Sequence, residues 1–112
     1  MKFSRCAAIF VLPVGLCFAA ETSEQPFLDA NNAAMKTMMS AMAIRPSGDV
    51  DADFAAMMIP HHQGAIDMAK AELQYGINER LRRIAQEIII DQQQEIAAMR
   101  LAVEQDSSNK DR

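Results

Sequence analysis

The chain has 112 residues, half of them hydrophobic, with nine Met, two Cys, no Trp and a formal net charge of −4. This length allows one small domain and excludes a two-domain enzyme with a large cleft between its domains. Few aromatic residues and only four Gly argue against a β-sandwich or barrel, whereas the abundant Ala, Met, Ile, Glu and Gln favour helices. We therefore predict an all-α protein, and the nine methionines are the feature to explain.

The first twenty residues are typical of a secretory signal peptide. Two basic residues precede an apolar run over residues 6–18, which is too short to span a bilayer comfortably as a helix. Cleavage after Ala19 leaves Cys17 and Ala19 at the positions that require small residues. We expect a signal peptide over 1–19 or 1–20 and a periplasmic or secreted protein, with a lipid anchor on Cys17 as the alternative.

Removal of this segment leaves 9 basic and 15 acidic residues, a net charge of −6. Such an acidic surface does not suit nucleic acid or anionic membranes, so neither is expected as a partner. Both cysteines are also removed, which excludes zinc-finger, thiol-redox and Cys-nucleophile chemistry. The rest divides into a helical domain over residues 21–106 and a polar tail over residues 107–112.

Breakers and capping residues divide the domain into three long helices, at about 26–43, 49–75 and 78–104. Pro60 lies inside the second helix and leaves the Ala56 carbonyl without its hydrogen bond. We expect a kink, or two helical pieces, immediately before His61 and His62. The sequence leaves open whether such a kink is merely tolerated or aims the two imidazoles.

Short connections make successive helices antiparallel neighbours, so positions can be matched by height. Reflection about residue 77 puts His62 level with Gln92, and reflection about residue 47 puts His61 level with Ala33. Errors of about one helical turn are expected. Both histidines, the first-helix methionines and the segment 92–99 then fall at one height.

Helical periodicity places most methionines on stripes that we expect to face the interior. The first helix contributes Met35, Met38, Met39 and Met42. The second contributes Phe54, Met57, Met58, His61, Ala65 and Met68. The third contributes Leu81, Ile84, Ala85, Ile88, Gln92, Glu95, Ile96, Met99 and Val103. Because a buried carboxylate is very costly, Glu95 needs a cation, a donor or water, and the histidines lie opposite it.

This convergence predicts a site for a soft metal ion. A thioether suits Cu(I) and Ag(I), and imidazole suits Cu, Zn and Ni. A spacing of four brings Met57 and His61, or Met58 and His62, onto one side of a helix, so that each pair can hold one ion. An exported, thiol-free chain rich in Met suits an oxidising compartment.

Each of these signals also has a structural explanation. A methionine stripe can be adaptable core packing, and adjacent histidines point about 100° apart. Gln92 can bond solvent, and Glu95 can form an ion pair with His61 or His62 without any metal. A helical interaction module with structural histidines therefore stays open. So does a small metalloenzyme at the same histidines and Glu95, although no nucleophile or substrate pocket is recognisable and we expect no enzyme.

Three segments resemble a bacterial family catalogued as domain of unknown function 305. They are the signature DADFAAMMIPHHQGAIDMA over residues 51–69, QQQEIAAMR over 92–100 and the leading MKTMMSAM over 35–42. The resemblance implies an exported protein with a ferritin-like fold. It also implies copper binding, because the family includes the periplasmic copper-binding proteins called CopM, which are implicated in copper resistance.

Carried over to this chain, the resemblance implies that copper is sequestered or carried without turnover, as Cu(I) with Cu(II) or Ag(I) as alternatives. A partner for copper transfer would remain to be identified. The implied ligands are His61, His62, Met57, Met58 and Met68, supported by Met35, Met38, Met39, Met42 and Met99. Glu95 and Gln92 are expected to lie behind these ligands.

Only three of the four helices of a ferritin-like bundle fit in this chain, so a second copy is the expected way to complete a small antiparallel bundle. Di-iron chemistry requires Glu-x-x-His pairs, and the sequence contains none.

Overall fold

The computed structural model describes residues 22–110, with the side chains of 109 and 110 excepted, and three helices account for most of this range. They are α1 (Glu24–Met42), α2 (Val50–Tyr75) and α3 (Glu79–Lys110). No strand occurs in the described part, so the predicted all-α fold with three long helices is confirmed. None of these helices is long and apolar enough to cross a membrane. The predicted signal peptide lies outside the described residues.

The two helix starts that the sequence predicts from capping residues are confirmed. The Asp49 carboxylate accepts hydrogen bonds from the backbone N–H groups of Asp51 and Ala52, at 3.1 and 3.2 Å. Asn78 Oδ1 accepts from the first-turn N–H groups of α3 in the same way. Each cap satisfies donors that have no partner inside the helix.

The C-terminal end of α2 is closed by a side chain from α3. Gly76 follows the helix in an extended conformation, with φ −75° and ψ 149°. The Arg82 guanidinium donates to the Leu73 and Gly76 carbonyls, which places a positive charge at the negative end of the helix dipole. This contact fixes the short turn between α2 and α3.

Helix α2 is a single helix from Val50 to Tyr75 with Pro60 inside it, so the alternative of two helical pieces is wrong, and the alternative of a kink stays a prediction. Helix α3 continues to Lys110, well past the end expected near residue 104. The Ser107 and Ser108 hydroxyls donate to carbonyls four residues earlier, so this polar segment is accommodated within the helix.

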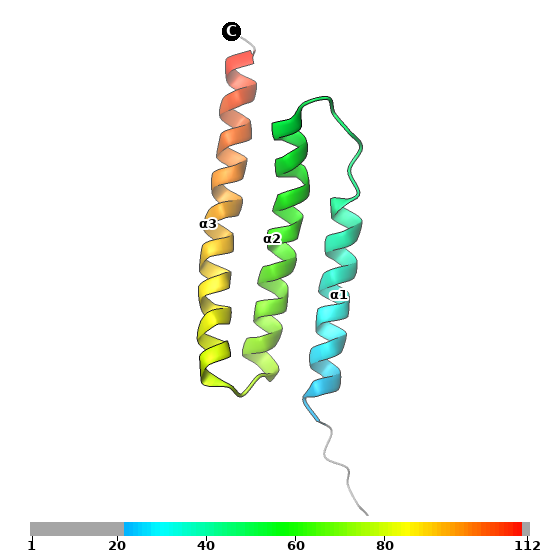
Figure 1. Ribbon diagram of the computed structural model, residues 1–112, viewed down its shortest axis with the longest axis vertical. Coiled ribbons are helices and arrows are strands. Elements are labelled where there is room, and N and C mark those ends of the chain that lie inside the picture. The colour runs from blue at the N-terminus through cyan, green and yellow to red at the C-terminus, as the bar shows by residue number, and fades with distance from the viewer. Residues whose placement is uncertain (1–21, 111–112) are drawn as a thin grey trace, which may run out of the picture.

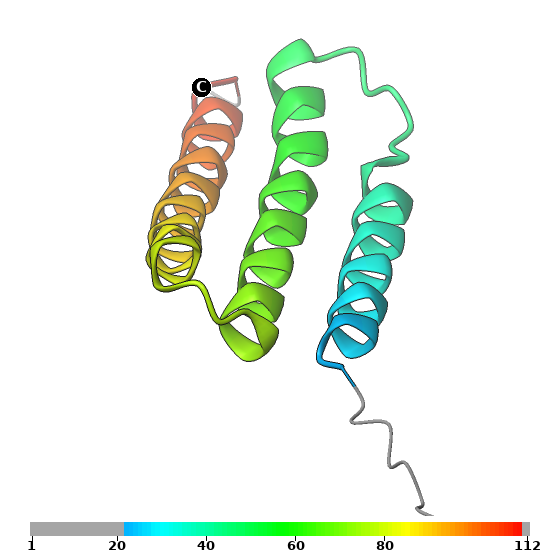
Figure 2. The same cartoon turned by 60° about the horizontal axis from the view of Figure 1, so that its bottom comes forward.

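Helix α2 lies between α1 and α3 and packs against both, whereas α1 and α3 do not contact each other. Figure 1 shows the three antiparallel helices side by side, and Figure 2 shows the same order from a second direction. The predicted antiparallel helical bundle is therefore confirmed, and in the single chain its three helices form an open layer whose outer two helices do not touch. Each broad face of the layer is uncovered in the single chain.

The register between neighbouring helices differs from the one that simple reflection predicts. Met38 lies directly on Gly64, where an added Cβ would be 2.6 Å from the Met38 sulfur, so reflection about residue 51, not 47, relates α1 to α2. The extended segment 43–49 runs along the side of α2 from the end of α1 to the start of α2. Figure 1 shows that α1 ends well below the start of α2. Extended residues rise about 3.3 Å each against 1.5 Å in a helix, which accounts for the shift.

The buried core of this layer is small. Ile66 is the one large side chain that is almost fully buried among the described residues, at 2 % exposure. The other buried apolar side chains are Ala34, Ala55, Ala69, Ala71, Ala85 and Ile96. Alanines let the helices approach closely, but they contribute little apolar area to the free energy of folding.

We predict that Gly64→Ala destabilises the fold through Met38. The new Cβ would lie 3.0 Å from both Cβ and Cγ of Met38, and overpacking of this kind costs about 1–3 kcal/mol against a gain of about 1 kcal/mol in helix propensity. Urea unfolding followed by circular dichroism measures the difference. In a Met38→Ala background the loss should become smaller, because the sulfur and Cγ contacts are gone and only the Cβ contact at 3.0 Å remains; an equal loss in both backgrounds would contradict the packing.

Candidate metal-binding face

His62 and Glu95 form the central polar contact of the layer. His62 lies on the side of α2 that faces α3 and is 8 % exposed. Its Nε2 is 2.6 Å from Oε2 of Glu95, whose side chain is 57 % exposed. A contact this short is typical of a charge-assisted hydrogen bond. The expectation that Glu95 is a buried carboxylate is wrong, because its side chain is mostly exposed, but it does have a partner, and that partner is His62.

The second ring nitrogen of His62 has no hydrogen-bond partner. Among the side-chain nitrogen and oxygen atoms that are buried in the described residues, Nδ1 of His62 alone lacks one. When the neutral imidazole donates from Nε2 to Glu95, Nδ1 keeps its lone pair. An imidazole that gives one nitrogen to a carboxylate and leaves the other as a free donor atom has the arrangement of histidine ligands in metal proteins.

His61 does not share the environment of His62. It is exposed, and its ring meets that of His62 edge-on, with centroids 5.9 Å apart and planes at 61°. Successive helical residues point about 100° apart, so only one of the two can face α3. The structure thus separates the histidine pair into one buried and one exposed imidazole.

The two neighbours of α2 lie on its opposite sides. His62 faces α3 and Gly64 faces α1, and two steps of 100° put these positions about 160° apart. The remaining α2 residues then point to one or the other broad face of the layer. One face receives the polar group of Gln63, Asp67 and Lys70, in which Gln63 and Lys70 both contact the Asp67 carboxylate.

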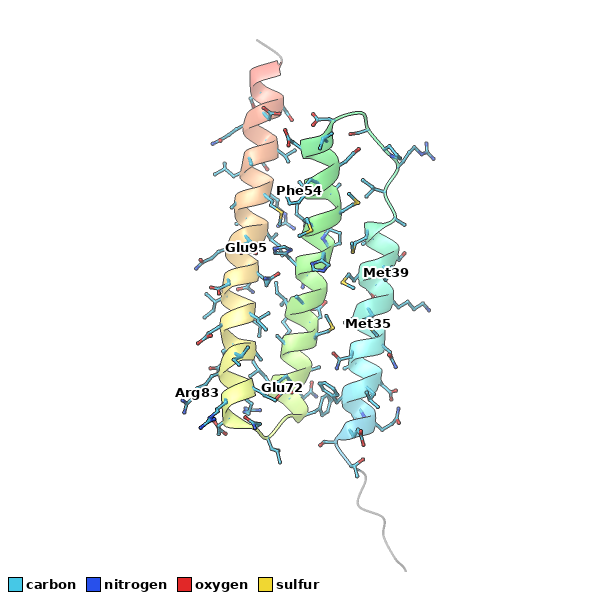
Figure 3. The ribbon with its side chains drawn as sticks, viewed as in Figure 1. Met35, Met39, Phe54, Glu72, Arg83 and Glu95 are labelled. Atoms are coloured by element: carbon cyan, nitrogen blue, oxygen red, sulfur yellow. The ribbon has the colours of Figure 1, made fainter. Side chains whose placement is uncertain are left out.

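The other broad face carries the apolar stripes of all three helices, and we name it the methionine face. Helical geometry assigns the exposed members of this face, with the contact of Met38 on Gly64 and the burial of Ile96 as reference points. Figure 3 shows Met35, Met39 and Phe54, which belong to α1 and α2, together with Glu95 on α3. The exposed apolar residues of this face are Leu28, Met35, Met39, Phe54, Met57, Leu81 and Ile84.

Core packing does not account for these methionines in the single chain. Met35, Met39 and Met57 are 43 %, 63 % and 37 % exposed. The remaining candidates are half-buried: Met38, Met42, Met58, Met68 and Met99. Among these, Met38 is occupied by its packing on Gly64. The sequence predicts correctly that the stripes share a side, but that side is a surface and not an interior.

Met58 and Met99 lie nearest to the buried histidine. Met58 precedes His62 by four residues and therefore lies one turn away on the same side of α2. The antiparallel register that pairs His62 with Glu95 puts Met99 level with Met58. Gln92, the residue that reflection puts level with His62, lies about one turn of α3 away and is half-buried.

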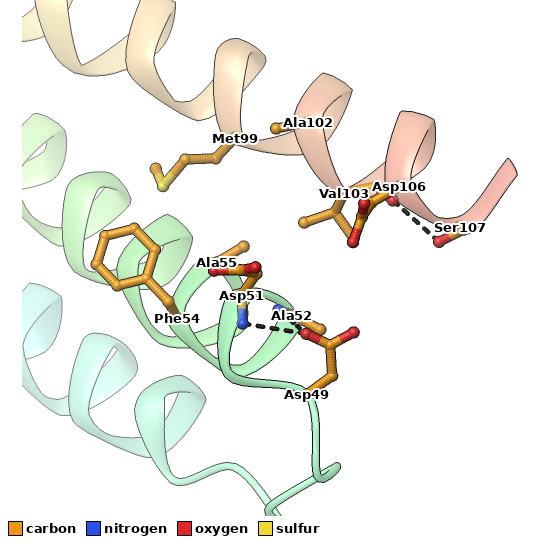
Figure 4. A pocket seen from close by; sticks show the side chains of 10 residues that line it. All are labelled: Asp49, Asp51, Ala52, Phe54, Ala55, Met99, Ala102, Val103, Asp106 and Ser107. Carbon is orange, nitrogen blue, oxygen red and sulfur yellow. Dashed lines mark hydrogen bonds between the residues drawn. The ribbon is translucent and has the colours of Figure 1, made fainter. Parts of the chain in front are cut away.

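Two hollows accompany the site. One, of about 370 Å³, lies between the start of α2 and the end of α3, where Met99 reaches across toward Phe54 (Figure 4). The other, of about 360 Å³, is an apolar groove over α2 near Ala65 and Ala69, with Ile84 on its α3 side. The small side chains at 65 and 69 make the groove, which the sequence does not predict.

No group of three or more His, Cys, Asp or Glu side chains within residues 22–110 is arranged to hold a metal ion. The trio of His61, His62 and Glu95 is therefore not assembled as one such site in the single chain.

A sequence profile places the chain in a family. The profile described as Domain of unknown function (DUF305) matches residues 18–103. The chain belongs to the DUF305 family. The match contains both histidines, Glu95 and the methionines from Met35 to Met99, so it confirms the resemblance seen in the motifs. No curated protein matches the chain.

We predict that Glu95→Ala lowers the free energy of unfolding by about 1–2 kcal/mol. A hydrogen bond to a charged group contributes about 1.5–3 kcal/mol, and the exposure of Glu95 reduces that value. Urea denaturation is the measurement, with Glu87→Ala, an exposed position on the same helix, as the control. The control should change stability by less than about 0.5 kcal/mol; equal effects would mean that the contact with His62 is not stabilising.

Proposed function

We propose that this DUF305 protein binds Cu(I) through His62 and the methionine face. The observation that carries the proposal is the buried His62 ring, with Nε2 on Glu95 and Nδ1 without a protein partner. An unpaired buried polar atom costs free energy, which a bound cation at Nδ1 would remove. Bound copper would supply a soft, monovalent centre that accepts nitrogen and thioether donors.

Met58 and Met99 are the ligands that would join His62. Both thioethers lie within about a turn of the imidazole, from different helices. One nitrogen and two sulfurs form a soft donor set that favours Cu(I) or Ag(I) over Zn²⁺ or Mg²⁺. Glu95 would act through His62, because a carboxylate on Nε2 fixes the orientation of the ring and leaves Nδ1 as the donor atom for the ion.

The exposed members of the face suit the entry of the ion. His61, Met57, Met35 and Met39 are all accessible, so they can take up copper before it reaches the buried nitrogen. The excess of acidic residues attracts cations to the surface. These features favour sequestration or carriage of copper in copper homeostasis, without turnover.

Export is part of the same proposal. The apolar run over residues 6–18 is typical of a signal peptide, and it contains both cysteines. A thiol-free, methionine-rich protein would keep its copper ligands in an oxidising compartment, where thiolates form disulfides.

We predict that His61→Ala, His62→Ala and Met58→Leu together weaken Cu(I) binding at least about 100-fold. Leucine keeps the volume of methionine but lacks the sulfur. Competition against a chromogenic Cu(I) chelator under anaerobic, reducing conditions measures the dissociation constant. Met38→Leu serves as the control, because this side chain packs on Gly64, and its effect should stay within about 3-fold. Unchanged affinity in the triple variant would exclude the proposed site.

Glu95→Gln gives a separate test of the carboxylate. The amide can still accept from Nε2 but carries no charge, so we expect Cu(I) affinity to fall by about 10- to 100-fold. The same competition assay measures it. An affinity equal to that of the parent chain would show that Glu95 takes no part in metal binding.

We predict that the exported protein begins after residue 19 or 20. Mass spectrometry of the protein recovered from the periplasm or medium distinguishes this product from the alternative. A lipid-modified N-terminus at Cys17 would replace the signal-peptide interpretation with an anchored form, and the full-length mass in the cytoplasmic fraction would contradict export altogether.

A further inference from the structure

The methionine face leaves more apolar surface in water than a folded monomer usually does. Its seven exposed large side chains are between 37 % and 63 % exposed. At roughly 200 Å² for a large side chain, they leave on the order of 600 Å² exposed, at the upper limit for the largest patch of a typical monomer. The half-buried Met58, Met68 and Met99 add to this area.

The single chain also buries little apolar surface in its own core. Apart from Ile66, the buried apolar side chains of the described residues are alanines and Ile96. A domain of this size is marginal even with a well-filled core. A partner that covers the methionine face would therefore supply much of the missing apolar burial, and it would have to be present whenever the chain folds.

We propose that a second copy of this chain covers the methionine face, so that the folded unit is a symmetric dimer of two three-helix layers. A copy is always present when the chain is made. The exposed area is close to the roughly 800 Å² per partner of a standard interface. The opposite side of α2, with Gln63, Asp67 and Lys70, is polar and stays in contact with water.

The two ends of the face have complementary shapes. Near one end of α2, Phe54 projects from the helix and is 55 % exposed. Near the other end, the groove of about 360 Å³ runs over Ala65, Met68 and Ala69 beside Ile84. In a two-fold arrangement, each copy presents its own Phe54 to the groove of the other.

This pairing fixes where the two-fold axis passes. Phe54 and Met68 are 14 residues apart on α2, a distance of about 21 Å along the helix. The midpoint is His61, which lies on the same face. The two α2 helices would then cross antiparallel, with the two His61 residues beside the axis and shielded from water. The proposal does not depend on copper.

The test is the mass of the full chain in solution, measured by sedimentation equilibrium with excess Cu(I) and divalent-metal chelators present. We expect a dimer at micromolar concentration. Phe54→Glu and Ile84→Glu should each raise the dissociation constant at least about 30-fold, as for central residues of an interface. Their exposures are 55 % and 49 %, so neither change disrupts the core of a single chain.

Matched controls lie on the other side of α3. Ile90 and Leu101 are 55 % and 54 % exposed, but helical geometry turns them away from the methionine face. Ile90→Glu and Leu101→Glu should leave the dissociation constant within about 3-fold. Equal weakening by the controls, or a monomeric parent chain at about 100 µM, would overturn the proposal. So would binding of a monomer to neutral phosphatidylcholine vesicles through Phe54.

A second measurement, made on the parent chain, tests the dimer even if the variants do not fold. The melting temperature of the parent chain should rise with protein concentration, because dimerisation stabilises the folded state by mass action. A melting temperature independent of concentration over a 100-fold range would overturn the dimer. Because all these samples contain chelators, a failure of copper binding would leave the result unaffected.

Discussion

Helix α2 is held on two opposite sides, and this constraint determines the rest of the structure. On one side Gly64 has no side chain and admits Met38; on the other His62 reaches Glu95. Because these positions are about 160° apart, α1 and α3 cannot contact each other around α2. The layer is open for this reason, and the residues between the two contacts become a face instead of a core.

Much of the fold can be predicted from the sequence because its signals are local. Capping residues such as Asp49 and Asn78 act on the first turn of the helix that follows them, and both caps occur in the structure. Helical periodicity likewise identifies which methionines share a side. The height of α1 could not be predicted in this way, because it depends on how far the extended segment 43–49 travels beside α2.

The candidate site is predictable in its composition but not in its geometry. The sequence indicates that Glu95 needs a partner and that the histidines lie near it, yet it leaves His61 and His62 as equal alternatives. The choice depends on a rotation of α2 that positions His62 between α2 and α3. Periodicity also cannot tell a covered stripe from an open one, since it reports which residues face together and not what they face.

The proposed copper site and the proposed interface use the same side chains for different reasons. A thioether is a soft ligand through its sulfur, but it covers apolar surface through its volume and flexibility. Replacement of methionines by leucine removes the first property and keeps the second, whereas a charge at Phe54 removes apolar contact and leaves every donor atom in place. His61 would serve the two roles only at different times, because copper can enter through this face in an unpaired chain but not once a second copy covers it. If both proposals hold, pairing would shield the exposed donor atoms of the face from water. His62, which contacts Glu95, would change least, because its ring is already buried in the single chain.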